Sequence, residues 1–291
     1  MRATSFRPPN AQNAKVFFIN DCRDHNAQAI QIGEWARYSN VDPHPTFVGI
    51  NHELEASFNM VNILKTFRHG KRGGIAVNGA PRSGTVKNGI DFGYFRHDEA
   101  WVVTTTGPTT LFLPCFLGVT KDIRVLDTEK TVDFLIEQGF ISPDDRDDII
   151  QSQFRSSVFS PAVLAYLLEH GEIPHTLQPI VPGEDALWEK DGGMFGRVCW
   201  IDNFGNLKLS TPSREFDSLA PGTTVPTEIV SGGFCAVLPY YPLLSMVPDG
   251  RMAITRGSSG VGKYRLLEVV IKGGRAVDVL KFKVGDRVLQ S

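Results

Sequence analysis

The sequence predicts an α/β fold, in which an N-terminal, mostly parallel sheet flanked by helices is followed by a small C-terminal antiparallel β-barrel. Two observations support this. In the first part of the chain, apolar runs such as KVFFIND alternate with segments of helical spacing such as AQAIQIGEWARYS. From Met194 onward, short strand-like runs and turn residues follow one another. Strand–helix alternation is typical of a parallel sheet covered by helices, and closely spaced short strands are typical of a barrel.

The period of the apolar residues places each element in order. In the first part we expect strands at 15–21, 45–51, 73–80, 100–106 and 123–127, and helices at 27–39, 54–67, 128–139 and 160–171. In the second part we expect strands at 194–202, 206–210, 223–230, 252–256, 265–273, 278–283 and 285–291. A stretch rich in proline and glycine separates the two parts. We therefore predict an α/β N-terminal domain at 1–175, a linker at 176–192 and a C-terminal β-barrel domain at 193–291.

The composition is that of a globular protein, with 42% hydrophobic and 21% charged residues. No apolar run approaches the roughly 18–20 residues of a membrane span. The first residues, MRATSFRPPNAQNAK, lack the continuous apolar core of a secretory signal. We therefore expect a cytoplasmic protein without a membrane partner.

Charge and cysteine usage narrow the possible partners. The chain has 30 Lys and Arg against 32 Asp and Glu and no long basic tract, so nucleic acid has no electrostatic support as a partner. Cys22, Cys115, Cys199 and Cys235 lack the paired spacing of a zinc site or a redox motif. We expect reduced, mostly buried thiols, no metal, and a small-molecule partner.

The glycine-rich stretch GSSGVGKY at 257–264 is close to a phosphate-binding loop. Such a loop needs Ser or Thr after its Lys to hold Mg²⁺, and it must open a helix. Here Tyr264 follows Lys263, and RLLEVVI at 265–271 is rich in branched apolar residues, which is typical of a strand. This context disfavours an ATP site and favours a hairpin connection whose glycines let the backbone approach a ligand.

Polar residues follow several of the expected strands. Asp21, Asp24 and Asn26 come after the first strand, and Asn78 and Arg82 come after the third. In a parallel sheet, ligands gather outside the carboxyl ends of the strands, so these side chains predict a site for a polar small molecule. Asp21 suits a ribose diol and Asp24 suits an ammonium group. The alternative is that Asp21 or Asn20 caps the next helix.

The predicted barrel contributes Phe204 and Asn206, within GRVCWIDNFGNLKLS. A planar ring can stack on a base while an amide recognises the donors and acceptors at the base edge. The alternative is a turn between two strands, with Phe204 in the core.

The segments VFFINDCRDHN, VCWIDNFGNL and LLEVVIKGGRAVDVLKFKVGDRV occur in this order. They resemble the first strand with its aspartate-rich loop, the Asp-x-Phe-Gly-Asn segment and the closing strands of the SAM hydroxide adenosyltransferase family, where SAM is S-adenosylmethionine. Relatives of that family include the fluorinase and chlorinase enzymes. The resemblance implies a homotrimer that binds SAM between the N-terminal domain of one subunit and the barrel of the next.

The resemblance also implies roles for individual residues. Asp21 matches the aspartate on the ribose hydroxyls, and Asp24 and Asn26 fall near the positions that hold the methionine end. Asp202 matches the barrel aspartate that faces the methionine ammonium.

Further barrel residues match substrate contacts of the family. Phe204 and Asn206 match the pair that contacts adenine. Arg256, Ser258 and Ser259 lie where family members carry a short loop over the substrate, so the resemblance implies that they cover bound SAM.

The implied reaction is substitution at the ribose C5′ by water or hydroxide, which gives adenosine and methionine. A sulfonium is a good leaving group, so the reaction needs mainly an aligned, partly desolvated nucleophile, and we expect no cofactor beyond SAM as substrate. Relatives that use hydroxide activate water with an aspartate, an arginine and a histidine. Arg82 matches the arginine, but Asn78 stands at the aspartate position and Phe154 near the histidine position. The remaining candidates for this step follow in the chain: Asp91, His97 and Asp98.

Two further functions stay open. A relative that uses halide would form a 5′-halo-5′-deoxyadenosine, and an anion needs only a desolvated pocket and no base. A protein that binds SAM or adenosine without catalysis would explain the departures at Asn78 and Phe154 alongside the retained Asp21, Phe204 and Asn206.

Overall fold

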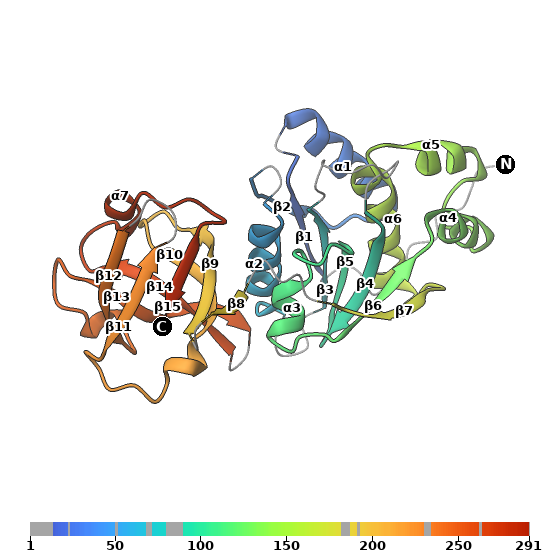
Figure 1. Ribbon diagram of the computed structural model, residues 1–291. Coiled ribbons are helices and arrows are strands. Elements are labelled where there is room, and N and C mark those ends of the chain that lie inside the picture. The colour runs from blue at the N-terminus through green and yellow to red at the C-terminus, as the bar shows by residue number, and fades with distance from the viewer. Residues whose placement is uncertain are drawn as a thin grey trace. The chain divides into compact units, whose positions relative to one another are not determined.

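The computed structural model describes residues 14–22, 24–49, 52–67, 72–79, 90–181, 187–190, 193–229, 234–261 and 264–290 (Figure 1). The chain forms two compact units. The first consists of Met1–Ala56, Thr66–Thr110 and Thr120–Ile180, and the second of Ser57–Lys65, Leu111–Val119 and Val181–Ser291.

The first unit is built on a seven-stranded sheet of order β2-β1-β3-β5-β4-β6-β7. Its strands are β1 (Lys15–Asn20), β2 (Pro43–Phe47), β3 (Gly73–Asn78), β4 (Phe92–His97), β5 (Ala100–Thr105), β6 (Asp122–Leu126) and β7 (Thr176–Pro179). β2, β1, β3 and β5 pair in parallel, while β4 is antiparallel to both β5 and β6, and β7 is antiparallel to β6. Only β4 and β7 therefore run opposite to the other strands, so the sheet is mostly parallel, as the sequence predicted.

One strand of this sheet and the segment at 176–192 differ from the sequence-based expectation. β4 was not expected, and it forms a tight hairpin with β5 in which Asp98 has a φ of 51°. Residues 176–192 were expected to be a linker, but β7 extends the first sheet and β8 (Leu187–Lys190) pairs with a strand of the barrel. In a strand, the backbone N–H and C=O groups bond to the neighbouring strand, whereas in a linker they would bond to water. The prolines of this segment do not prevent pairing, because proline is tolerated in a short edge strand.

The helices of the first unit are α1 (His25–Tyr38), α4 (Thr128–Glu137), α5 (Arg146–Gln151) and α6 (Arg155–Glu169), with a 3₁₀ turn η1 (Pro143–Asp145). α2 (Glu53–Leu64) is divided between the two units, and α3 (Phe112–Phe116) belongs to the second. α1 and α4 each begin at an aspartate whose carboxylate accepts a backbone N–H: Asp24 from Ala27 at 2.8 Å and Asp127 from Lys130 at 3.2 Å. Such caps satisfy N–H groups that a helix leaves unpaired at its start.

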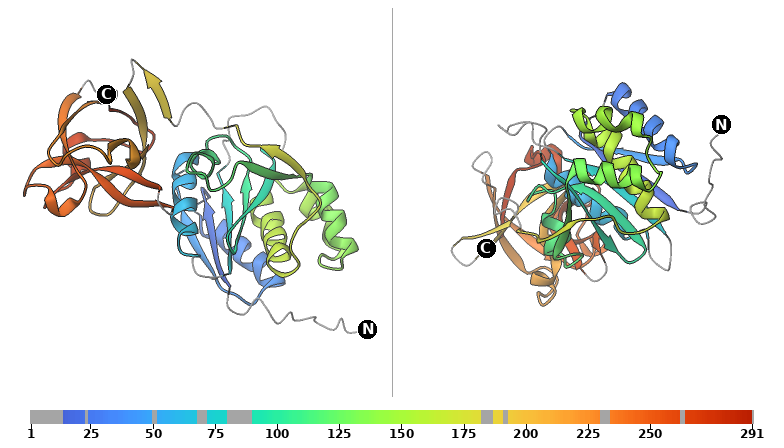
Figure 2. Two further views of the ribbon diagram at one scale, coloured as in Figure 1. Left: turned by 90° about the horizontal axis from the view of Figure 1, so that it is seen from below. Right: turned by 90° about the vertical axis from the view of Figure 1, so that its right-hand side faces the viewer.

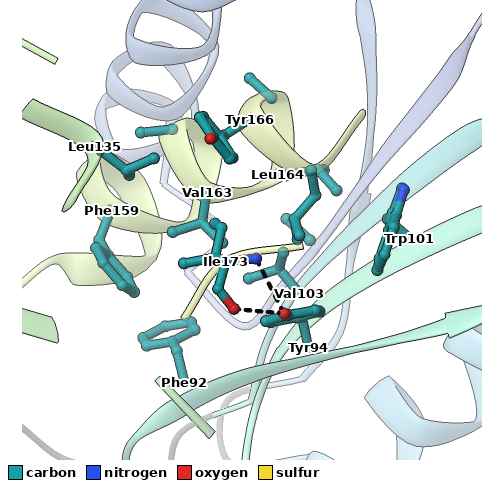
Figure 3. Close-up of a cluster of buried hydrophobic side chains, with 14 of the residues drawn as sticks. Phe92, Tyr94, Trp101, Val103, Leu135, Phe159, Val163, Leu164, Tyr166 and Ile173 are labelled. Atoms are coloured by element: carbon teal, nitrogen blue, oxygen red, sulfur yellow. Dashed lines mark hydrogen bonds between the residues drawn. The ribbon is translucent and has the colours of Figure 1, made fainter. Parts of the chain in front are cut away.

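α6 is almost wholly buried and packs on β3, β5 and α1. Figure 3 shows the apolar cluster that it forms with the sheet. Tyr94 lies within this cluster, where its hydroxyl donates to the carbonyl of Ile173 at 2.8 Å and accepts the Ile173 N–H at 3.1 Å. Burial raises the pKa of Tyr94 to about 12, so the hydroxyl stays protonated and joins β4 to the segment after α6.

The second unit contains an eight-stranded sheet of order β10-β14-β13-β12-β11-β15-β9-β8. Its strands are coloured yellow to red in Figure 2. Besides β8, its strands are β9 (Gly193–Ile201), β10 (Leu207–Pro212), β11 (Thr224–Ile229), β12 (Phe234–Tyr241), β13 (Met252–Val261), β14 (Tyr264–Ile271) and β15 (Arg287–Gln290). β9 pairs with both β15 and β10, so the sheet closes on itself as the predicted barrel. All its pairs are antiparallel except β12–β13, which meet in parallel at Tyr240–Ile254 and Tyr241–Thr255.

The barrel encloses its own apolar core, which includes Val198, Leu209, Tyr240, Ile254 and Val269. Two 3₁₀ turns, η2 (Ser213–Phe216) and η3 (Leu244–Met246), and one short helix, α7 (Ala276–Leu280), connect its strands. Residues 278–283 were expected to be a strand, and this was wrong. Val277 and Leu280 both pack against the core while Val279 is exposed, which is the three-residue spacing of a helical turn.

None of the described helices is long and apolar enough to cross a membrane.

Replacing Tyr94 with Phe tests the role of its hydroxyl. The variant leaves the buried Ile173 N–H without its partner, while the Ile173 carbonyl keeps its contact with His175 Nδ1 at 2.8 Å, so we expect a loss of about 1–3 kcal/mol in the free energy of unfolding. Tyr38→Phe is a matched control, because the buried Tyr38 hydroxyl has no hydrogen-bond partner among the described residues and its removal should be neutral or stabilising. Urea unfolding of both variants measures this, and equal effects would contradict the assignment.

Candidate functional site

A buried polar cluster lies at the carboxyl ends of β1 and β3. The Asn78 amide donates to Asn20 Oδ1 at 3.1 Å and to Asp21 Oδ1 at 3.0 Å. The Asn20 amide donates to Gln31 at 3.3 Å, and Gln31 in turn donates to the backbone of Ser156 at 3.0 Å. Asn20, Asp21 and Asn78 are 1%, 6% and 8% exposed, so this network holds the Asp21 carboxylate in a fixed position.

The topology explains why a ligand site belongs here. From β1 the chain crosses to β2 on one side, and from β2 it crosses back over β1 to β3 on the other side. In folds of this kind, ligands bind at the carboxyl edge of the sheet, at the point where the strand order reverses. Asp21 and Asn78 occupy this point, so the structure brings together two of the residues predicted from sequence.

Other predicted residues of this domain lie differently. Asp24 and Asn26 are exposed, and Asp24 caps α1, so the capping role that the alternative gave to Asp21 or Asn20 belongs to Asp24. Arg82 lies outside the described residues. His97 and Asp98 lie at the β4–β5 hairpin, at the opposite edge of the sheet from the carboxyl end of β5, so they do not substitute for the missing triad residues.

Glu53 is an acidic residue at this edge that the sequence analysis missed. It is the first residue of α2, and its Oε1 accepts a hydrogen bond from the Thr110 hydroxyl at 3.3 Å, which also lies 3.4 Å from the carbonyl of Gly79. Burial raises the pKa of Glu53, the Thr110 hydrogen bond opposes this, and the negative charge of Asp21 raises it further. A Cβ at Gly107 would lie 2.6 Å from this Oε1, so glycine there leaves room for the carboxyl group.

The segment matched to the family histidine contributes a buried cation. Phe154 is 58% exposed, but the next residue, Arg155, is 8% exposed and donates to the Thr128 hydroxyl at 3.1 Å and to the Ile90 carbonyl at 3.2 Å. Burial lowers the pKa of Arg155, and the charge of Asp91 partly restores it. Arg155 therefore joins α4, α6 and the start of β4, next to Asp91 at the carboxyl edge of the sheet.

In the barrel, Asp202 organises the loop between β9 and β10. Its Oδ1 accepts the backbone N–H groups of Phe204 at 3.0 Å and Asn206 at 2.9 Å. Its Oδ2 accepts the Asn206 amide at 3.1 Å and the Lys208 ammonium at 3.1 Å. Gly205 has a φ of +76°, a left-handed conformation that favours glycine.

This loop presents Phe204 outward. The ring is 76% exposed, so the alternative that placed Phe204 in the core was wrong, while the turn that this alternative expected is present. An exposed ring beside a partly buried amide at Asn206 is compatible with stacking on a base and reading its edge.

Lys208 connects Asp202 to Glu268. Lys208 and Glu268 pair across β10 and β14, and the Lys208 ammonium contacts both carboxylates. Lys208 is 6% and Glu268 8% exposed, so this is a buried ion cluster. Burial by itself raises the pKa of Asp202, but the Asn206 N–H and the bond and charge of Lys208 outweigh it and hold this pKa below its ordinary value.

The glycine-rich stretch is mostly strand. Arg256, Ser258 and Ser259 lie in β13, and the β13–β14 register shifts between Arg256 and Gly260. Arg256 lies 3.7 Å from Asp217, while Ser258 is exposed and Ser259 is 5% exposed. The loop expected over the substrate is therefore an irregular strand end, because β13 continues to Val261.

The described residues contain no group of three or more His, Cys, Asp or Glu side chains that could hold a metal ion. Among the described residues, Cys22, Cys115 and Cys199 form no disulfide, but only Cys199 is buried, so the expectation of mostly buried thiols was wrong for the first two. The side chain of Cys235 lies outside the described residues.

The fold and these loops define an α/β unit followed by a barrel that carries an Asp-x-Phe-Gly-Asn loop. Residues 196–289 match the family model of the SAM hydroxide adenosyltransferase C-terminal domain. The C-terminal part of the chain is thus similar to this domain family, and the resemblance noted in the sequence is confirmed. No curated protein matches the chain.

Two solved structures share the fold over nearly the whole chain. An uncharacterized conserved protein from Thermotoga maritima is 15% identical with a TM-score of 0.64, covering 95% of this chain and 100% of its own. A conserved hypothetical protein from Thermus thermophilus is 18% identical with a TM-score of 0.57, covering 96% and 100%. At these identities the likeness shows the fold alone.

The Asp202–Lys208 contact predicts an acid-sensitive contribution to stability. Because the pKa of Asp202 is lower in the folded than in the unfolded protein, its stabilisation is present at neutral pH and is lost as the pH falls through the folded value. Asp202→Asn should cost about 1.5–3 kcal/mol at pH 7 and progressively less toward pH 3. Thermal melting of the parent and the variant across this pH range measures the difference in their stability. A difference that does not change with pH would contradict the ionic role.

Proposed function

We propose that this protein binds SAM and cleaves it at the ribose C5′ with water, releasing adenosine and methionine. The observation that carries the proposal is the family match of residues 196–289, which includes the Asp202–Asn206 loop. The buried Asp21 carboxylate, at the strand-order reversal where such sheets bind ligands, supports it as the ribose contact. In this proposal the protein is a trimer, and the barrel of one subunit completes the site of the next.

The proposal assigns the base to Glu53. Asn78 has no carboxylate to accept a proton, whereas Glu53 lies at the same edge of the sheet with a raised pKa. An incoming water would lose its proton to the Glu53 carboxylate as its oxygen bonds to C5′, and the bond from C5′ to the sulfonium sulfur would break, leaving methionine as a thioether. A carboxyl group with a raised pKa suits this role because its pKa lies closer to the pH at which the reaction takes place.

Product analysis tests the proposed reaction. Purified protein incubated with SAM should yield adenosine and methionine at a rate independent of added chloride or fluoride. A 5′-halo-5′-deoxyadenosine that appears only with halide would favour the halogenase. Tight calorimetric binding of SAM without any nucleoside product would favour the non-catalytic binding protein, which the departures at Asn78 and Phe154 already motivate.

Replacing Glu53 with Gln tests the assigned base. General-base catalysis contributes about 10²–10⁴-fold, so Glu53→Gln should lower kcat by at least about 100-fold while the Kd of SAM changes little. In the parent, kcat should rise with pH through the raised pKa of Glu53, because only the deprotonated carboxyl accepts a proton, and this limb should vanish in the variant.

Glu99→Gln is the matched control, since Glu99 is an exposed surface residue that pairs with Arg96 on β4. A Glu53→Gln protein with unchanged kcat and pH profile would show that the base lies elsewhere.

A further inference from the structure

The Asp202 carboxylate is fully occupied by the protein's own donors. Each of its oxygens accepts two hydrogen bonds, two from backbone N–H groups at Oδ1 and two from the side chains of Asn206 and Lys208 at Oδ2. An ionised carboxylate offers about four acceptor positions in all. A ligand ammonium at Asp202 would therefore have to displace one of these donors.

Lys208 is the donor that resembles a ligand ammonium, and it is held in place. Its backbone pairs with Glu268 across β10 and β14, and its ammonium also contacts the Glu268 carboxylate. Both side chains are buried, so withdrawing Lys208 would leave two carboxylates without their common counter-ion, which is costly away from water. The lowered pKa of Asp202 agrees with a permanently paired carboxylate.

The neighbouring groups remain open to a ligand. Phe204 is 76% exposed, and Asn206 is only partly buried, although one amide hydrogen is used on Asp202. The loop thus offers a ring face and an amide carbonyl to an adenine, but no carboxylate acceptor to an amino group.

We propose that Lys208 occupies, as part of the protein, the place at Asp202 that a ligand ammonium would need, so that the barrel selects adenosyl compounds by their nucleoside and not by an α-amino group. This rests on the proposed function, since it concerns the same adenosyl site. The class of ligands widens accordingly to adenosyl sulfonium and thioether compounds, with or without the amino group of methionine, and the sulfonium compounds among them are the substrates.

Two ligands that differ only in this group test the proposal on the unmodified protein. S-adenosylhomocysteine and its desamino analogue, which carries a 3-carboxypropylthio group at C5′, should bind with Kd values within about threefold of each other in calorimetry. A free Asp202 would instead make a charge-assisted hydrogen bond to the ammonium and favour S-adenosylhomocysteine by about 10- to 100-fold.

The Lys208→Met variant keeps the length of the side chain and removes its charge. It should create a preference of at least about tenfold for S-adenosylhomocysteine over the desamino analogue. Lys272→Met is the matched control, because Lys272 pairs with the exposed Asp249 outside this cluster and its loss should leave the ligand ratio unchanged. Melting curves for both variants show whether they are folded. If Lys208→Met is not folded, the ratio of the two Kd values in the parent protein alone tests the role of Lys208.

The outcomes separate the two proposals. A parent that turns over SAM yet prefers S-adenosylhomocysteine by tenfold or more overturns the role of Lys208 and leaves the proposed function standing. A folded Lys208→Met protein with an unchanged ratio also overturns that role. If neither ligand, adenosine nor SAM binds the parent, both proposals fall.

Discussion

The parallel pairing of β1 with β3 is the constraint on which the candidate site depends. It places Asn20 directly beside Asn78, and Asp21 follows at once. Side chains alternate between the faces of a strand, so a slip of one residue would turn the Asn78 amide away from both acceptors. The buried branched residues of these strands fix the register, because the same slip would bring smaller residues of β3 into the places of Ile75 and Val77. The position of a polar site thus follows from apolar packing beneath it.

A similar dependence holds in the barrel. The loop from Asp202 to Asn206 joins β9 to β10, and the pairing of these two strands is what closes the sheet. Asp202 satisfies the N–H groups of Phe204 and Asn206, and Arg275 and Val277 donate to the carbonyls of Asn203 and Gly205. The backbone of the loop is thus held from both sides while Phe204 faces outward. The β9–β10 pairing covers the edges that these two strands would otherwise expose. Lys208, which forms the ion cluster with Glu268, lies on β10, one of these two strands.

The elements with strong periods could be predicted from the sequence, whereas contacts between distant residues could not. β1, β3 and β5 and the polar residues after them were found because the carboxyl edge of a parallel sheet is a general ligand position. Glu53 was missed although it follows the second strand, and attention to that strand's end would have found it. Lys208 and Glu268 are 60 positions apart, so only the register of β10 on β14 reveals that they meet. α7 was mistaken for a strand because a one-turn helix is too short to show its period.

Asn78 illustrates how a departure from a family pattern can fit its surroundings. Its amide donates to two acceptors at once, Asn20 Oδ1 and Asp21 Oδ1, which an ionised carboxylate cannot do. An aspartate at this position would add a further negative charge where Asp21 already raises the pKa of Glu53. The amide therefore donates to the charged form of Asp21, while burial and the charge of Asp21 raise the pKa of Glu53. In the proposed reaction, an amide at position 78 and a base at Glu53 then follow from one electrostatic arrangement.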